Sequence, residues 1–344
     1  MLSQKLPNKH GALRHLALAI HPANSKQKFL LMLNLTSYTD ETGHPDDPTL
    51  EYVGMAGFVA PFGAWEIFEA AWDDLLRNAG LAEPFHMKDF AHSQGQFKPW
   101  KGKEELRRAF IGRAVSIIVE TRGTPVGAVV SMSSFRTLTE EQQSHFLDPY
   151  YLALQNCTRG AAIQAVFEPP EEKVAMVYSY NSEYGTNNGG RAEQLWHAIR
   201  QGWDHGNRMG SYASSTPAIL SPLQAADLLA YELSHEFENR VKRPNDAMRW
   251  PLRQIMGMYR IPSPRMTLFD RNELLRIVKE SNWPDQTGVE ELERPGHKSA
   301  QSSMIDWMVE RGQFTKDHYA GFFEAAVERL KTIKRVNENR RRKL

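Results

Sequence analysis

The sequence lacks several features that would place it in a specialised class. Its single cysteine, Cys157, excludes an internal disulfide framework, and the apolar pattern around it favours a small buried side chain. No stretch approaches the roughly 18 consecutive apolar residues of a membrane-spanning helix, and the run at 16–20 is too short for a signal-peptide core. These absences predict a cytoplasmic protein that does not associate with membranes.

The sequence also has little net charge, since its formal charge is +1 over 344 residues. That charge is unevenly placed, because the segment Lys331 to Leu344 holds seven Lys or Arg residues against Glu338. The basic tail from Lys331 to Lys343 is therefore a candidate contact for nucleic-acid phosphates. A solvated end of an amphipathic helix accounts for the same pattern at least as well.

Several signatures of common enzyme classes are missing. The sequence contains no paired CxxC, HExxH, GxxxxGK[ST] or GxSxG motif, and no GxGxxG between a strand and a helix. These absences remove the motif evidence for zinc proteases, P-loop enzymes, α/β-hydrolases and dinucleotide-binding folds.

The order of apolar patterns predicts an α/β fold with a mixed sheet flanked by helices. Strand patterns occur from Leu31 to Asp40 and at 51–60, 125–132 and 173–178, and helical periodicity at 65–79, 104–120, 149–167, 189–203 and 222–233. The segment 84–90 has too little periodicity for a surface helix, and 211–217 is a polar connection. We expect an N-terminal arm at 1–28, a main domain at 29–241 and a helical C-terminal extension at 242–344 that is packed on or tethered to it.

Two adjacent carboxylates end the first apolar run. Asp40 and Glu41 follow a strand that is apolar on both faces, and Gly43 then provides a turn. Ligands and metals commonly bind at such strand ends in open α/β sheets, which makes this pair a candidate site. A polar exit from the strand into a turn is the structural alternative.

Asp227 is the most informative residue of the second half. It lies within the apolar helix pattern 223–233, where an ionised carboxylate costs several kcal/mol unless it meets a cation, a hydrogen-bond donor or a metal. Gln224 and Tyr231 share its helix face, whereas Glu232 does not. A bond to a loop backbone or an arginine would satisfy Asp227 without any catalytic role. Ser221 can cap this helix and Pro222 suits its first position.

A carboxylate at a strand end and another on a helix suit metal-dependent phosphoester chemistry. Mg²⁺ prefers oxygen ligands, and a bridging carboxylate can hold two ions that activate water and stabilise the leaving oxygen. His86 and His92 offer nitrogen ligands but lack a zinc-type spacing.

Three segments together resemble one protein family. The segment TDETG at 39–43 is similar to the Asp-Glu-Ser-Gly opening of the bacterial domain-of-unknown-function family 3800, with Thr42 in place of serine. The segment FHMKDF at 85–90 resembles its His-x-Lys-Asp-Phe/Leu motif, and PLQAADLLA at 222–230 resembles its Leu-Gln-x-Ala-Asp helix. The resemblance covers about 29–239 and implies a ribonuclease H-like, integrase-type fold with a metal-dependent nuclease site.

One position departs from the family pattern. Ser179 stands where family members usually have an aspartate after the later strand, and a neutral serine supplies neither charge nor bidentate oxygens. Glu183 is a candidate replacement for that acid, and Asn181 could supply a carbonyl oxygen.

The leading hypothesis is a nuclease that uses Mg²⁺ or Mn²⁺. We assign metal binding to Asp40, Glu183 and Asp227, catalysis to Asp40, Glu41, His86 and Asp227, and support of these groups to Asp89 and Gln224. One competing hypothesis is a catalytically degenerate interaction module of an antiphage or mobile-element system, which contacts a protein partner through its C-terminal extension. Another is a metal-dependent hydrolase of small phosphorylated molecules.

Overall fold

A mixed six-stranded sheet forms the centre of the protein. The computed structural model describes residues 35–43, 50–144, 146, 148–166, 168, 172–187, 189–243, 245–257 and 265–279. The strands are β1 (Leu35–Thr42), β2 (Tyr52–Pro61), β3 (Thr124–Ser131), β4 (Val174–Ser179), β5 (Met209–Ser215) and β6 (Arg265–Phe269). Their order is β5-β4-β1-β2-β3-β6. β2 is antiparallel to β1 and β3, whereas β4 is parallel to β1 and β5, and β6 is parallel to β3.

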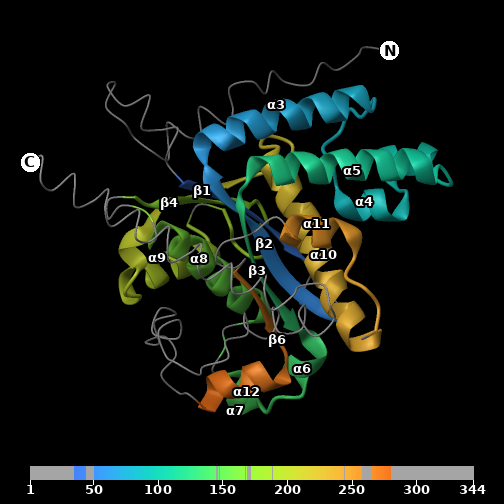
Figure 1. The fold of residues 1–344 in the computed structure, drawn as a ribbon. Helices are drawn as coiled ribbons and strands as arrows, with labels where there is room; N and C mark the ends of the chain where they lie inside the picture. The colour runs from blue at the N-terminus through green and yellow to red at the C-terminus, as the bar shows by residue number, and fades with distance from the viewer. Residues whose placement is uncertain are drawn as a thin grey trace, which may run out of the picture.

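Helices cover both faces of the sheet, as Figure 1 shows. One face packs against α3 (Phe62–Asn78), α4 (Met87–His92), α5 (Glu104–Thr121), α10 (Pro222–Lys242) and α11 (Trp250–Gly257). The other packs against α8 (Pro149–Val166), α9 (Arg191–Gly202) and α12 (Arg271–Lys279). Short helices α6 (Met132–Arg136), α7 (Glu140–Gln143), η1 (Gly95–Trp100) and η2 (Gly206–Arg208) lie in the connections. The predicted α/β class with a mixed, helix-flanked sheet is confirmed.

The close fit of β1 against its neighbours follows from its sequence. Every residue from Leu35 to Asp40 is buried, as expected for a strand covered on both faces. Gly57 lies opposite Thr39, and a Cβ there would stand 1.9 Å from the carbonyl oxygen of Tyr38, so only glycine permits this approach. Trp65 of α3 donates to the carbonyl of Thr36 at 3.0 Å and fixes the helix to the strand.

Most predicted elements are present, but β5, α4 and the cap of α10 differ from expectation, and the strand β6 lies in a region predicted to be a helical extension. β5 occupies a segment expected to be a polar connection, because an edge strand buries little side-chain surface and shows no alternation. Residues 87–92 form the short helix α4, anchored by the buried Met87 and Phe90. Ser221 makes no capping bond to α10, and its hydroxyl donates to Asp73 of α3 at 3.0 Å instead.

The region after residue 242 contributes to the main sheet. β6 pairs with β3, and α11 packs against α5 and α10. The N-terminal arm and the basic tail Lys331 to Lys343 lie outside the described residues. No helix in the described part of the chain has both the length and the apolar character needed to cross a membrane.

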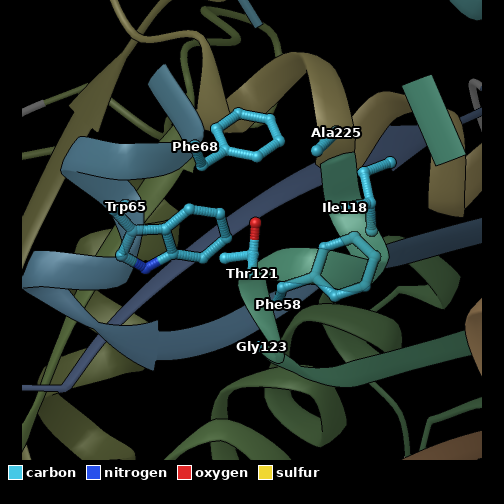
Figure 2. Close-up of a pocket in the computed structure, with 7 residues that line it drawn as sticks. All are labelled: Phe58, Trp65, Phe68, Ile118, Thr121, Gly123 and Ala225. Carbon is cyan, nitrogen blue, oxygen red and sulfur yellow. The ribbon is translucent and has the colours of Figure 1, made fainter. Parts of the chain in front are cut away.

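A small apolar gap lies where α3, α5, β2 and α10 meet (Figure 2). It encloses about 160 Å³, including some open solvent, but is nowhere wide enough for a water molecule. Its two polar groups are already bonded, Trp65 to Thr36 and the Thr121 hydroxyl to Ile117. The gap therefore reflects packing and offers no ligand site. It is lined by Phe58, Trp65, Phe68, Ile118, Thr121, Gly123 and Ala225.

Candidate functional site

Three parallel strands end at the same edge of the sheet. β1, β4 and β5 run in one direction, and Thr39 pairs with Tyr178, so Asp40 lies beside Ser179 one position further along. Helix α10 packs across β1 and β2 and carries Asp227 to this edge. The topology thus joins residues that are about 190 positions apart in the sequence.

Asp40 is a buried carboxylate with a charged neighbourhood. Its side chain is 6% exposed, the Ser179 hydroxyl donates to it, and its Oδ1 accepts from the backbone N–H of Glu41 at 2.9 Å. Burial raises the pKa of Asp40 well above its ordinary value, and the charges of Glu41 and Asp227 raise it further. Asp40 is therefore the centre of a cluster of three carboxylates.

Strand alternation starts the Glu41 side chain on the opposite face of β1 from Asp40, but its carboxyl group reaches a hydrogen bond with the Asp40 side chain. The Asn181 side-chain amide donates to Oε1 of Glu41 at 2.8 Å. Its Oε2 is enclosed and receives no hydrogen bond from the described residues. Burial raises the pKa of Glu41, the charge of Asp227 acts in the same direction, and the hydrogen bond with Asp40 lowers it. One oxygen of Glu41 is thus fixed and the other is left without a donor.

Asp227 connects α10 to the start of α4. Its Oδ2 accepts from the backbone N–H of Met87 at 2.7 Å and lies 3.6 Å from Nδ1 of His86. Because α4 has no capping side chain of its own, Asp227 satisfies one of the free N–H groups in its first turn. The interaction with Asp227 raises the pKa of His86, whose side chain is 53% exposed.

Gln224 holds the segment that carries His86. Its Oε1 accepts from Nε1 of Trp72 and from the backbone N–H of Phe85, both at 2.9 Å, and its Nε2 donates to the carbonyl of Pro217 at 2.8 Å. The side chain is fully buried. These bonds tie α3, α10 and the start of α4 together.

Two other predicted residues, Glu183 and Asp89, are not among the groups that act on the pKa of Asp40 or Glu41. Glu183 is exposed, and its backbone N–H donates to Oδ1 of Asn181 at 2.9 Å. The sequence made this oxygen of Asn181 a candidate metal ligand, but it already accepts a hydrogen bond. Asp89 is half-buried in the first turn of α4, where its charge contributes to the raised pKa of His86.

The structure adds Tyr150 of α8, a site residue that the sequence did not indicate. Its ring is fully buried, its hydroxyl has no hydrogen-bond partner among the described residues, and the charge of Glu41 helps to raise its pKa. Tyr150 starts an almost wholly apolar helix, so its sequence pattern is that of any core aromatic.

The described residues include no group of three His, Cys, Asp or Glu side chains arranged to hold a metal ion. Asp40, Glu183 and Asp227 therefore do not form a ready-made cage. Mg²⁺ usually retains several waters and takes only one or two carboxylates plus substrate phosphates, so it does not require such a cage. The oxygen-rich donor set and the enclosed Oε2 of Glu41 are compatible with a hard divalent cation.

Comparison with known proteins identifies no relative. No protein-family model matches this chain, and neither curated proteins nor solved structures give a match to it.

Proposed function

We propose that this protein is a divalent-metal-dependent nuclease with a ribonuclease H-like fold. Three antiparallel strands, β1 to β3, are followed by β4 and β5, which add in parallel beside β1. That order is typical of ribonuclease H-like sheets, and β6 extends it at the β3 edge. The topology supports the fold that the three sequence motifs imply, and the resemblance to the domain-of-unknown-function family 3800 remains part of the proposal.

The observation that carries the proposed chemistry is uncompensated negative charge at the sheet edge. The charges of Glu41 and Asp227 raise the pKa of Asp40, the charge of Asp227 raises that of Glu41, and no described lysine or arginine is among the groups acting on the pKa of either. Buried carboxylates without a cationic partner are costly. A divalent cation would remove that cost. It would also bind Glu41 Oε2, which has no hydrogen-bond donor among the described residues.

In the proposed mechanism, Asp40, Glu41 and Asp227 would hold Mg²⁺ or Mn²⁺. When bound, the cation supplies positive charge to the phosphate oxygens and makes a water molecule more acidic. Ser179 and the Glu41 backbone N–H orient Asp40, while Asn181 orients Glu41. These fixed contacts limit reorganisation of the carboxylates during reaction.

His86 is the proposed proton carrier. Its imidazole is half-exposed and contacts Asp227, which raises its pKa and increases the protonated fraction near neutral pH. A protonated His86 can deliver a proton to the leaving oxygen of the phosphodiester. The Gln224 bonds hold the adjacent Phe85 backbone and thereby fix the position of His86.

A second candidate function is that of a non-catalytic ribonuclease H-like interaction module. Two observations favour it: neutral Ser179 lies beside Asp40, and Asp227 already accepts a bond from the Met87 backbone. In this alternative, Asp227 stabilises the start of α4, and the carboxylates have no catalytic role.

Cleavage assays separate the candidates. Purified protein would be incubated with single-stranded DNA, duplex DNA, RNA and nucleotides, with Mg²⁺, Mn²⁺ or EDTA. The proposal predicts metal-dependent cleavage of a polynucleotide, reduced at least about 100-fold by Asp40→Asn and by Asp227→Asn. Folding of each variant is checked by circular dichroism.

Other outcomes would reject the nuclease proposal. Hydrolysis of nucleotides alone would identify a hydrolase of small phosphorylated molecules. Absence of cleavage by the folded wild-type protein under every metal condition would favour the non-catalytic module.

A further inference from the structure

Tyr180 has an exposed aromatic ring and stands in the chain between two residues that bond the carboxylate cluster. Its side chain is 50% exposed, although it follows the fully buried β4 strand. Its preceding neighbour, Ser179, donates to Asp40, and its following neighbour, Asn181, donates to Glu41. Tyr180 therefore lies between two residues that touch the carboxylates, each about 3.8 Å away along the backbone.

The other tyrosines of this region are part of the core. Tyr150 and Tyr184 stack with ring centroids 3.6 Å apart, and Tyr178 stacks on Tyr212 at 5.0 Å. Among the described residues, Trp250 of α11 is the other aromatic side chain exposed by two-fifths or more. Packing therefore accounts for the neighbouring tyrosines but leaves the Tyr180 ring open to solvent.

The backbone of Tyr180 is held in place. Its N–H donates to the carbonyl of Ser215 at 2.6 Å, which continues the pairing of β4 with β5 beyond the end of the strand. A ring on a fixed backbone loses little conformational freedom when a ligand stacks on it. The residue after Tyr180, Asn181, bonds Glu41, and on the α10 side of the cluster the exposed His86 imidazole contacts Asp227.

We propose that Tyr180 stacks on an unpaired base of single-stranded nucleic acid whose adjacent phosphate lies at the carboxylate cluster. This inference rests on the proposed nuclease function and assigns its substrate class. A stacking surface requires a base with a free face, which a single strand offers and a continuous duplex does not. The surrounding carboxylates disfavour an acidic peptide at the same ring.

The test measures binding of a fluorescein-labelled oligothymidylate by anisotropy, with Ca²⁺ replacing Mg²⁺ to prevent cleavage. Tyr180→Ala is expected to weaken binding about 5- to 150-fold, which corresponds to the loss of one base-aromatic stack. Tyr180→Phe retains the ring and should bind within about twofold of wild type. Trp250→Ala removes the other exposed ring and serves as the matched control, with unchanged affinity expected.

A strand of the same length with abasic sugars completes the experiment. Wild type and Tyr180→Ala should bind it equally, because it offers no base to stack. Equal binding of oligothymidylate by wild type and Tyr180→Ala would overturn the inference and leave the nuclease proposal intact. A loss with Tyr180→Ala that persists on the abasic strand would also overturn it. Failure of the wild-type protein to bind or cleave any nucleic acid would overturn both proposals.

Discussion

Two carboxylates of helix α10, Asp227 and Glu232, have opposite electrostatic surroundings. Glu232 is fully buried, and Arg249 contacts both of its oxygens, with Nε at 2.8 Å and Nη2 at 2.9 Å. Asp227, little more than one turn earlier, faces Asp40 and Glu41. On the same helix, Glu232 is neutralised by an arginine, whereas Asp227 adds its negative charge to that of two other carboxylates.

The difference separates a structural role from a ligand-binding role. Arg249 directly precedes α11, so its pair with Glu232 links that helix to α10. The carboxylates at the sheet edge obtain donors from Ser179, Asn181 and Met87 but no compensating lysine or arginine among the groups acting on Asp40. Polar contacts position these groups, and their charge remains available for an external cation.

The largest stability effect is expected at the neutralised carboxylate. Arg249→Met would leave Glu232 buried without its cation, which typically costs about 3–5 kcal/mol. We expect the lower end of that range, because the Arg249 side chain is 34% exposed and water can reach the site. Urea unfolding monitored by circular dichroism measures the change.

The double variant Glu232→Gln/Arg249→Met provides the control. It removes both charges and should recover much of the lost stability. An Arg249→Met variant as stable as wild type would show that the pair of Arg249 with Glu232 does not stabilise the contact of α11 with α10. The distinction between a structural Glu232 and a ligand-binding Asp227 would then fail.

Asp40→Asn should have the opposite and smaller effect, namely stabilisation in the absence of metal. The pKa of Asp40 is raised from its ordinary value of 3.8, so the folded protein retains a proton that the unfolded chain has released. Its contribution to the free energy of unfolding therefore falls as the pH rises from 3.8 to the raised pKa, and stays low above it. Removing the charge should restore the lost free energy of unfolding. Each kcal/mol restored raises the Tm by about 2–4 °C.

Thermal unfolding in EDTA across a pH series checks this prediction. The Tm difference between Asp40→Asn and wild type should grow with pH and then level off. A variant less stable than wild type at neutral pH would show that Asp40 is electrostatically satisfied in the folded state.

The smallest effect is expected at Glu183. This side chain is exposed and is not among the groups that act on the pKa of Asp40. Glu183→Gln should change the Tm by less than about 1 °C and cleavage by less than about twofold. A loss of metal affinity in this variant, measured by calorimetry, would restore Glu183 as a ligand.

The sequence indicated which carboxylates need partners better than it indicated the partners themselves. The apolar run before Asp40 and the apolar helix around Asp227 were sufficient to identify two carboxylates that require partners, of which Asp40 is buried and Asp227 is partly buried. The partner of Asp227 could not be predicted, because a backbone N–H such as that of Met87 is common to nearly all residues. The motif order led us to single out Ser179, which hydrogen-bonds Asp40 at the sheet edge.

Short and edge elements limited the prediction of the fold. β5 buries only Met209 fully, so it lacks the alternation that identifies a strand. α4 spans six residues and has too few turns for a helical period. Glu183 lies in a local turn in which the Asn181 side chain accepts from the Glu183 backbone N–H. The residue types alone did not specify that turn, so the exposure of the Glu183 side chain could not be predicted.

Calorimetric titration with Mn²⁺ tests the central claim most directly, because it measures cation binding without requiring a known substrate. Wild type and Glu183→Gln should bind Mn²⁺ with similar affinity, and Asp40→Asn and Asp227→Asn should bind at least about tenfold more weakly. Folded wild-type protein that binds no Mn²⁺, or an Asp40→Asn variant that binds it as tightly as wild type, would contradict the account.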